Sequence, residues 1–291
     1  ENQNTIMFSI LRIWIPWLLD IILVRDSKDI VEIEKLDEID RLSSLKPLPW
    51  YLSFLFKPNA HWNTSNDTWT LPTTSKTSAQ LQDKLDWHIN WLSKGYTQEQ
   101  LDVIVTAIKE KDEVALHRGV QRAICSNLTE KPLTDDILDA ALDIISGGAI
   151  FQTFNSKKAK KSLEAKKVVF RFAEQNVDLE HALASGGQVV KLIKSTLEHP
   201  GRSLNEAITQ SPEVGSTIRH ITKHSTLGGR LWMPASKGSI VIMTLGSASK
   251  KTGDTNFTFG SGTAVRACCA KSIIINLVTD IHKSLGSKKL N

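Results

Sequence analysis

One stretch near the C-terminal end of the chain places two glycines, an arginine and a cysteine directly before an apolar helical run. It spans residues 257–271 and has the sequence FTFGSGTAVRACCAK. The N–H groups at the start of a helix stabilise the thiolate form of a cysteine placed there. Gly260 and Gly262 allow a large flat partner to approach the backbone closely. Arg266 can bind a carboxylate of the same partner.

Haem has the features that suit these residues, because it is flat, carries propionates and contains an iron that binds cysteine thiolate. Two adjacent cysteines, Cys268 and Cys269, leave the iron ligand open between them. An alternative interpretation needs no cofactor. In it, a strand, a glycine turn and a helix enclose two buried cysteines that act as small hydrophobic residues.

Composition indicates a globular protein with a core of its own. The chain has 291 residues, of which 41% are hydrophobic and 23% charged. Three cysteines are too few for a disulfide framework, and we expect a cytoplasmic protein. The net charge of +5 comes largely from lysines in residues 156–161 and 166–167. A solvated helix face explains them, with a docking face for an acidic partner or a membrane surface as the alternative. No segment resembles a nucleic-acid-binding module.

The N-terminal residues 6–24 are apolar but interrupted by charges and a proline. This is a poor transmembrane helix, and no signal-peptide cleavage pattern follows it. Trp14 and Trp17 suit a membrane interface, so a peripheral membrane contact is one hypothesis. The other is a core strand over residues 21–25, followed by a helix from Asp29.

Helical spacing of apolar residues dominates the middle of the chain. Residues 43–77 are rich in Pro, Trp, Ser and Thr and are expected to form loops with short extended pieces. Helices are predicted around 81–92, 101–108, 114–124 and 135–147, and one long helix over 170–196. The last contains the small-residue run 184–187, where glycines destabilise a helix by about 1 kcal/mol each. Either something large packs against this run, or the helix breaks there.

The cysteine stretch resembles the haem-binding loop of cytochromes P450. In that loop a phenylalanine, two glycines, a basic residue, the cysteine and a small residue recur, and the matching residues here are Phe259, Gly260, Gly262, Arg266, Cys268 and Ala270. The register favours Cys268 over Cys269 as the ligand. The loop here is longer than usual between its second glycine and the cysteine.

Three further segments resemble the same family in the same order. The small-residue run and the following LEHP, residues 197–200, resemble the central helix and its end. The segment 204–209 resembles the Glu-x-x-Arg helix, with Glu206 present and Thr209 in place of the arginine. Residues 211–241 resemble the strands that follow, with Arg219 in the place of a residue that binds a haem propionate. His117 is similarly placed on an early helix.

The resemblance implies a mainly α fold with small β-sheets, of truncated cytochrome P450 type. We expect one domain over residues 1–291, with a pocket-roof region (1–77), a helical region (78–200) and a cofactor region (201–291). It implies haem b with Cys268 as the iron ligand. Arg266, Arg219, Phe259, Gly262 and His117 would contact the cofactor. We assign no catalytic side chain.

The resemblance also implies an oxidoreductase, of the monooxygenase or peroxygenase class, that acts on a small apolar or lipid-like substrate. The acid–alcohol pair that delivers protons to dioxygen in relatives is absent, with Gln188, Val189 and Val190 near its place. This favours a peroxide, or rearrangement of a substrate hydroperoxide, over dioxygen and a redox partner. The alternative is a degenerate, non-catalytic protein that binds a ligand or partner, favoured by Thr209.

Overall fold

A computed structural model describes residues 10–15, 19–36, 38–40, 61–63, 68–70, 93–147, 156–174, 176–199, 201–210, 217–227, 233–259, 268 and 270–286. The chain forms two compact units. The first contains Glu1–Pro47, Thr73–Lys84 and Asn205–Cys268, and the second contains Leu48–Pro72, Leu85–Leu204 and Cys269–Asn291. The single domain over residues 1–291 stays a prediction.

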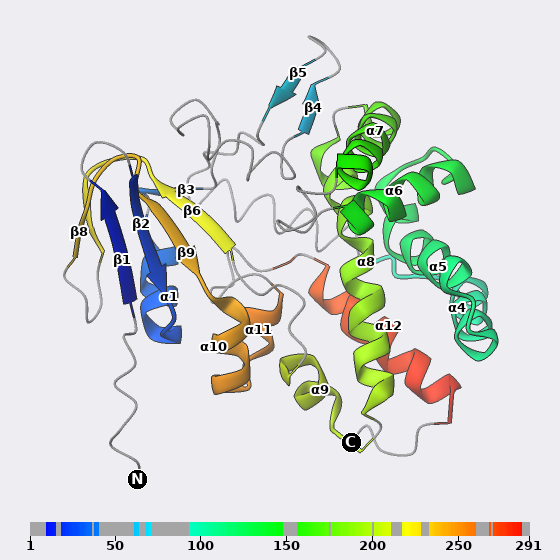
Figure 1. The fold of residues 1–291 in the computed structure, drawn as a ribbon. Helices are drawn as coiled ribbons and strands as arrows, with labels where there is room; N and C mark the ends of the chain where they lie inside the picture. The colour runs from blue at the N-terminus through cyan, green and yellow to red at the C-terminus, as the bar shows by residue number, and fades with distance from the viewer. Residues whose placement is uncertain are drawn as a thin grey trace. The chain divides into compact units, whose positions relative to one another are not determined.

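The first unit is built on a five-stranded sheet in the order β1-β2-β9-β6-β3 (Figure 1). The strands are β1 (Ile10–Ile15), β2 (Leu19–Val24), β3 (Ile39–Asp40), β6 (Thr217–Ile221) and β9 (Ile240–Met243). β2 and β9 are parallel, and the other neighbouring pairs are antiparallel. The continuous apolar runs of β2 and β9 explain their central places, because such strands are buried on both faces.

The described residues of the first unit also form four helices and a hairpin. They are α1 (Ser27–Glu34), α9 (Leu204–Gln210), α10 (Leu245–Thr252), α11 (Thr255–Thr258) and the β7–β8 hairpin (Ser225–Leu227 and Met233–Ala235). Asp26 starts α1 by accepting a hydrogen bond from the Lys28 amide at 2.9 Å. Ile30 and Ile33 of α1 are fully buried in the core beneath the sheet. The predicted strand and following helix are thus confirmed with shifted bounds, whereas β1 was not predicted.

The second unit is mainly helical (Figure 1). It contains α4 (Gln98–Glu110), α5 (Glu113–Cys125), α6 (Asp135–Gly147), α7 (Ser156–Ala173), α8 (Val177–Glu198), α12 (Lys271–Ser284), the 3-10 turn η2 (Ser126–Leu128) and the hairpin of β4 (His61–Asn63) and β5 (Thr68–Thr70). The helices predicted around 101–108, 114–124 and 135–147 are confirmed. The helix predicted around 81–92 lies outside the described residues, as does most of the predicted loop region 43–77.

The single helix predicted over residues 170–196 is wrong, because α7 ends at Ala173 and α8 begins at Val177. Glu174 takes a left-handed backbone conformation with φ of 49°, which stops the helix. Asn176 then accepts a hydrogen bond from the Leu179 amide at 3.1 Å and starts the next helix. The small-residue run 184–187 lies inside α8, so the helix does not break there.

α12 is fastened to two other helices of the second unit by buried or half-buried side chains. His282 and Thr196 of α8 lie within hydrogen-bonding distance, 3.0 Å from Nε2 to Oγ1. The Tyr96 hydroxyl, just before α4, donates to Asp280 at 2.7 Å. Burial and this hydrogen bond raise the pKa of Tyr96. The helix that follows the cysteine stretch therefore has fixed neighbours.

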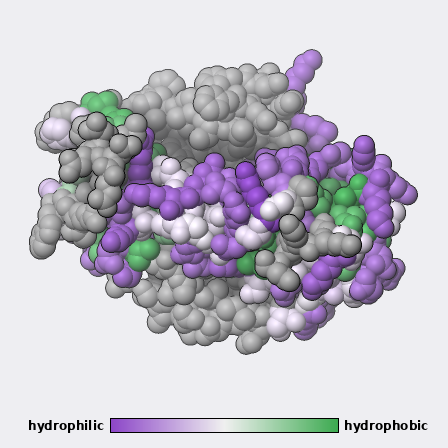
Figure 2. Space-filling view, turned by 90° about the horizontal axis from the view of Figure 1, so that it is seen from below, coloured by the Kyte–Doolittle hydropathy of each residue, from purple (hydrophilic) through white to green (hydrophobic). Residues whose placement is uncertain are grey.

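The lysine-rich surface predicted on α7 is only partly solvated. Lys157, Lys160 and Lys161 are exposed, but Lys166 is 5% exposed. Lys166 therefore lies on the buried face of α7, and the exposed lysines lie on its solvent face. No helix in the described part of the chain is long and apolar enough to cross a membrane. Where residues are coloured in Figure 2, the surface is mostly hydrophilic, with a few separate hydrophobic areas.

Candidate functional site

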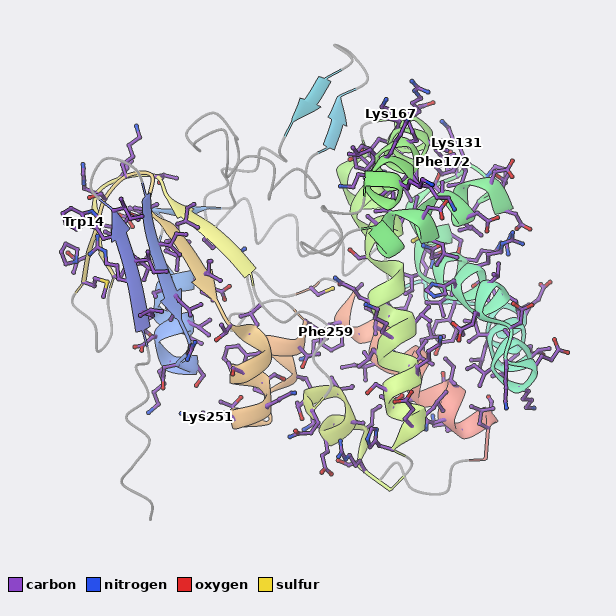
Figure 3. The ribbon with its side chains drawn as sticks, viewed as in Figure 1. Trp14, Lys131, Lys167, Phe172, Lys251 and Phe259 are labelled. Atoms are coloured by element: carbon purple, nitrogen blue, oxygen red, sulfur yellow. The ribbon has the colours of Figure 1, made fainter. Side chains whose placement is uncertain are left out.

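The two ends of the predicted cofactor loop meet in the first unit. The Cys268 amide donates a hydrogen bond to the Phe259 carbonyl, with 3.1 Å between nitrogen and oxygen. Phe259, labelled in Figure 3, is 8% exposed and ends α11. The bond holds together the two ends of the predicted loop, and we call this pair the fixed base of the loop. Gly262, Arg266 and Cys269 lie outside the described residues, so their roles stay predictions.

Cys268 differs from the other described cysteine in the two properties that matter for metal binding. It is half-buried and precedes the 14-residue helix α12, whose N-cap residue, Ala270, provides no side-chain cap. The amides of an uncapped first turn favour nearby negative charge. Cys125 on α5 is fully buried, and burial raises the pKa of its thiol to about 12. A thiolate ligand is therefore compatible with Cys268 and not with Cys125.

Two buried hydroxyl groups support the residue before Phe259. The Oγ atoms of Ser249 on α10 and Thr258 on α11 are 2.6 Å apart. The Thr258 hydroxyl also donates to the Ile208 carbonyl on α9 at 3.4 Å, and the Ser249 hydroxyl to the Asp254 carbonyl at 3.3 Å. We call Ser249, Thr258 and the Ile208 carbonyl the hydroxyl cluster. It joins α9, α10 and α11 directly beneath the fixed base of the loop.

The helix predicted to carry Glu206 is confirmed as α9. Glu206 is exposed, whereas Thr209 is 2% exposed. Thr209 donates its hydroxyl proton back to its own helix, at 2.9 Å from the Asn205 carbonyl and 3.2 Å from that of Glu206. In this helix, neutral hydroxyl groups occupy the interior where the family resemblance implied an arginine.

Arg219 is buried in the first unit beside a carboxylate. It is 4% exposed and its Nη2 lies 3.6 Å from Oε1 of Glu34, at the end of α1. Glu34 is itself 3% exposed. The pairing of β6 with β9 brings this arginine to the sheet, and sequence analysis gave no signal for its contact with Glu34. Contact of Arg219 with a propionate stays a prediction.

The small-residue run of α8 accommodates a side chain from α5. A methyl group on Gly186 would lie 2.6 Å from Cγ of Gln121, which is too close. Gln121 is fully buried and donates from Nε2 to the Leu183 carbonyl at 3.1 Å. The large group packed against this run is therefore Gln121. Its Oε1 is buried without a hydrogen-bond partner among the described residues.

His117 lies on the same helix as Gln121, one turn before it, and is half-buried. Its Nδ1 is buried and has no hydrogen-bond partner among the described residues. Burial, followed by the charge of Lys194 on α8, lowers the pKa of His117. A neutral imidazole with an unused nitrogen is available here. Whether it contacts a cofactor, as predicted, stays a prediction.

The two arginines on this helix bind α6. Arg118 forms hydrogen bonds with both carboxylate oxygens of Asp139, at 2.8 and 2.7 Å, and pairs with Asp135 at 2.7 Å. Arg122 also contacts Asp135. The Arg118 hydrogen bond lowers the pKa of Asp139. Both guanidinium groups thus already have carboxylate partners on α6.

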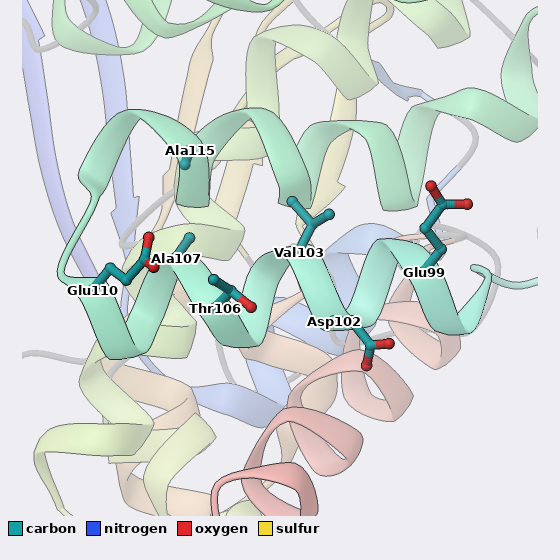
Figure 4. Close-up of a pocket in the computed structure, with 7 residues that line it drawn as sticks. All are labelled: Glu99, Asp102, Val103, Thr106, Ala107, Glu110 and Ala115. Carbon is teal, nitrogen blue, oxygen red and sulfur yellow. The ribbon is translucent and has the colours of Figure 1, made fainter.

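A shallow pocket of about 470 Å³ lies along α4 and the start of α5 (Figure 4). It is lined by Glu99, Asp102, Val103, Thr106, Ala107, Glu110 and Ala115, none of them a predicted site residue. No group of three or more His, Cys, Asp or Glu side chains suited to a metal ion occurs among the described residues. A single thiolate ligand, as haem iron takes, is consistent with this donor set.

No family model matches the sequence, and no curated protein matches it. Solved structures do match. Cytochrome P450SP alpha (CYP152B1) in complex with (R)-ibuprofen is similar with a TM-score of 0.63 and 11% identity, over 95% of this chain and 85% of that chain. Cytochrome P450EX alpha (CYP152N1) with myristic acid has a TM-score of 0.55 and 10% identity, over 94% and 82%.

A third similar structure is a cytochrome P450 with a different family number from the first two. Mycobacterium smegmatis CYP164A2 with econazole bound has a TM-score of 0.63 and 12% identity, over 92% of this chain and 84% of that chain. Likeness at this level of identity concerns the course of the backbone and not the activity. The fold class predicted from the sequence is confirmed: this chain has the cytochrome P450 fold, in a form that is highly divergent in sequence.

Proposed function

We propose that the chain is a haem-thiolate oxidoreductase of the cytochrome P450 type, with Cys268 as the iron ligand. The observation that carries the proposal is the Cys268 amide bonded to the Phe259 carbonyl, which fixes a half-buried cysteine just before α12. The confirmed fold class supports haem as the cofactor. Arg219, Arg266 and His117 would bind the propionates, and Phe259 and Gly262 would contact the ring.

The proposed substrate is a small apolar or lipid-like molecule. The similar structures hold (R)-ibuprofen, myristic acid and econazole, which are all organic molecules with large apolar parts. An apolar substrate would be bound mainly through the hydrophobic effect, with few polar contacts to orient it.

The proposed oxidant is a peroxide, or a hydroperoxide group of the substrate itself. A haem iron with a thiolate ligand favours cleavage of the O–O bond. On α8, Gln188 is exposed, and Val189 and Val190 are buried and carry no exchangeable side-chain proton. None of the three is an acid or an alcohol, so these positions lack the pair that delivers protons to dioxygen in the family. With hydrogen peroxide, one oxygen atom enters a substrate C–H bond and the other leaves as water, so no electron donor is needed.

A second candidate function is a non-catalytic protein that keeps the fold and binds a ligand or partner. It is favoured by Thr209, whose hydroxyl is used within α9 where an arginine was expected. The absorption spectrum of the purified chain separates the two candidates. We expect a Soret band whose position in the ferrous carbon monoxide complex is typical of thiolate ligation. A protein that takes up no haem when supplied with it would support the second candidate.

Turnover assays test the oxidant. We expect product from an apolar carboxylic acid, such as myristic acid, with hydrogen peroxide and little with a reductase, NADPH and dioxygen. Efficient NADPH-driven turnover with negligible peroxide-supported activity would show that the chain delivers protons by another route.

A further inference from the structure

The edge strand β1 presents a concentration of exposed apolar side chains. Leu11 and Ile13 are each 48% exposed, Trp14 is 64% exposed and Ile15 is 43% exposed. Only three other large hydrophobic residues of the described chain, Val103, Val114 and Val168, are exposed to a similar degree. Because side chains alternate along a strand, Trp14 points to the opposite face of the sheet from Ile13 and Ile15. Apolar groups therefore meet solvent on both faces of one strand.

The charged residue within this strand is neutralised by its neighbours. Arg12 binds both carboxylate oxygens of Asp20 on β2, at 2.7 and 2.8 Å, and donates to the Pro234 carbonyl at 3.0 Å. The hydrogen bond with Asp20 raises the pKa of Arg12. Burial alone would raise the pKa of Asp20, but hydrogen bonds from Arg12 and Ser239 outweigh it and lower the pKa. The strand thus carries no uncompensated charge among its apolar residues.

Exposed lysines lie at the same end of the sheet as Trp14 and Ile15. At this end β1 stops at Ile15, which pairs with Leu19 at the start of β2. β9 begins here with Ile240, which pairs with Ile21 of β2 on one side and with His220, near the end of β6, on the other. The turns at this end contain Lys223, His224 and Lys237, all exposed. The Gly238 amide donates to the Ile221 carbonyl at 2.8 Å and holds these two turns together. Among the described residues, three acidic residues lie near this end: Asp20, which Arg12 binds, the half-buried Glu38, and Asp40 of β3, which pairs with His220 at the opposite edge.

We infer that this end of the sheet binds the surface of a lipid bilayer that contains anionic lipids. Trp14, Ile13 and Ile15 would enter the interface between headgroups and acyl chains, where tryptophan is most stable. Lys223 and Lys237 would lie among the anionic headgroups. A fluid medium can close around both faces of an edge strand, whereas a rigid partner would cover one. The contact is peripheral, and it concerns neither the haem nor the reaction.

The test is flotation of the whole purified chain with phosphatidylcholine vesicles, with and without phosphatidylserine. An Ile13→Ser/Trp14→Ser variant removes the apolar part. Its control is Val103→Ser/Val114→Ser, at residues of α4 and α5 that are 45% and 44% exposed. A Lys223→Gln/Lys237→Gln variant removes the basic part. Lys250→Gln/Lys251→Gln, exposed on α10, controls for net charge. Circular dichroism confirms that each variant is folded.

We expect wild type and both controls to float with the phosphatidylserine vesicles and to be released by salt. The Ile13→Ser/Trp14→Ser variant should bind these vesicles at least about tenfold more weakly than wild type does. Each lost lysine should weaken binding to the anionic vesicles by about fivefold. Equal flotation of wild type and the serine variant, or none by wild type, overturns the inference. The inference is also overturned if wild type does not bind vesicles but forms a dimer that the Ile13→Ser/Trp14→Ser variant does not form. That result would assign β1 to contact with a second copy of the chain.

Discussion

The amide of Cys268 is hydrogen-bonded to the carbonyl of Phe259, although eight residues separate them in the sequence. The bond sets the position of Cys268 relative to α11, because Phe259 is buried at the end of that helix. Phe259 also donates its own amide to Thr255 and Asn256. The cysteine is thus attached by its backbone to a helix of the first unit.

Substituting the two adjacent cysteines separately tests the ligand assignment. Cys268→Ser should abolish the thiolate-type spectrum and greatly reduce haem content, because a serine hydroxyl does not replace a thiolate. Cys269→Ser should retain both. Cys125→Ser serves as a control at the cysteine whose thiol has a raised pKa. Haem content and the ferrous carbon monoxide spectrum are measured for all three. Loss of the spectrum in Cys269→Ser alone would move the ligand by one residue.

Thr258→Val should loosen the base of the loop. It removes the hydroxyl that contacts Ser249 and the Ile208 carbonyl while keeping the side-chain shape. Leaving buried polar groups without partners costs about 1–3 kcal/mol, so the free energy of unfolding should fall by that amount. The Soret band should also broaden or shift if the cluster positions Cys268. Thr226→Val, at an exposed threonine of β7, is the control. An unchanged spectrum with lowered stability would limit the cluster to a structural role.

The helices could be predicted well where the spacing of apolar residues was the main signal. Apolar spacing gave α4 and α5, and Thr97 and Asp112 start these helices by capping them. It missed the break between α7 and α8, because apolar spacing continues across residues 174–176 while the left-handed Glu174 and the cap at Asn176 interrupt the backbone.

The long-range side-chain contacts could not be predicted from the sequence, for a different reason. Gln121 and Leu183 are 62 residues apart, and Arg219 and Glu34 are farther apart still. No local pattern specifies such pairs, since each depends on how helices and strands pack. The small-residue run did signal close packing on α8, but it did not identify Gln121 as the neighbour. The place of Cys268 just before a helix, in contrast, follows from the local sequence and is confirmed, whereas its role as iron ligand stays a prediction.

Gly186→Ala tests the contact between α5 and α8. The added methyl would lie 2.6 Å from Cγ of Gln121, and overpacking of this kind typically destabilises by about 1–3 kcal/mol. Gly201→Ala, where a methyl would meet nothing within 4 Å, is the control. Urea denaturation measures both. In the double variant Gly186→Ala/Gln121→Ala the loss should be smaller than the sum of the single losses, because the clash is removed. Additive losses would mean that Gly186 is not constrained by Gln121.

Lys166 should make stability depend on pH above neutrality. Burial lowers its pKa to about 8, against about 10.4 in an unfolded chain. Between these values the unfolded chain binds more protons than the folded one, so stability rises with pH, and below about pH 8 the full penalty remains. Lys166→Met should remove this slope and raise the free energy of unfolding at pH 7 by on the order of 2–3 kcal/mol. Lys160→Met, on an exposed part of α7, should keep the wild-type slope. A slope that persists in Lys166→Met would contradict the assignment.

Arg219→Ala should destabilise the chain and speed haem loss, and the two effects can be separated. Arg219 is 4% exposed and lies 3.6 Å from Glu34, and removing one member of a buried ion pair typically costs about 3–5 kcal/mol. A Glu34→Gln/Arg219→Met variant removes both charges together and should recover much of the lost stability. If Arg219 also binds a propionate, this double variant will still lose haem faster than wild type.

Haem transfer to apomyoglobin, timed for wild type, Arg219→Ala and Glu34→Gln/Arg219→Met, decides between the roles. Arg219→Lys should rescue haem retention only partly, because lysine lacks the planar fork that binds a carboxylate through two hydrogen bonds. Equal transfer rates in wild type and the double variant would show that Arg219 serves Glu34 alone. The propionate role would then rest on Arg266 and His117. A faster rate in a double variant whose free energy of unfolding equals that of wild type would indicate a lost contact with haem, because its fold keeps no buried unpaired charge at this position.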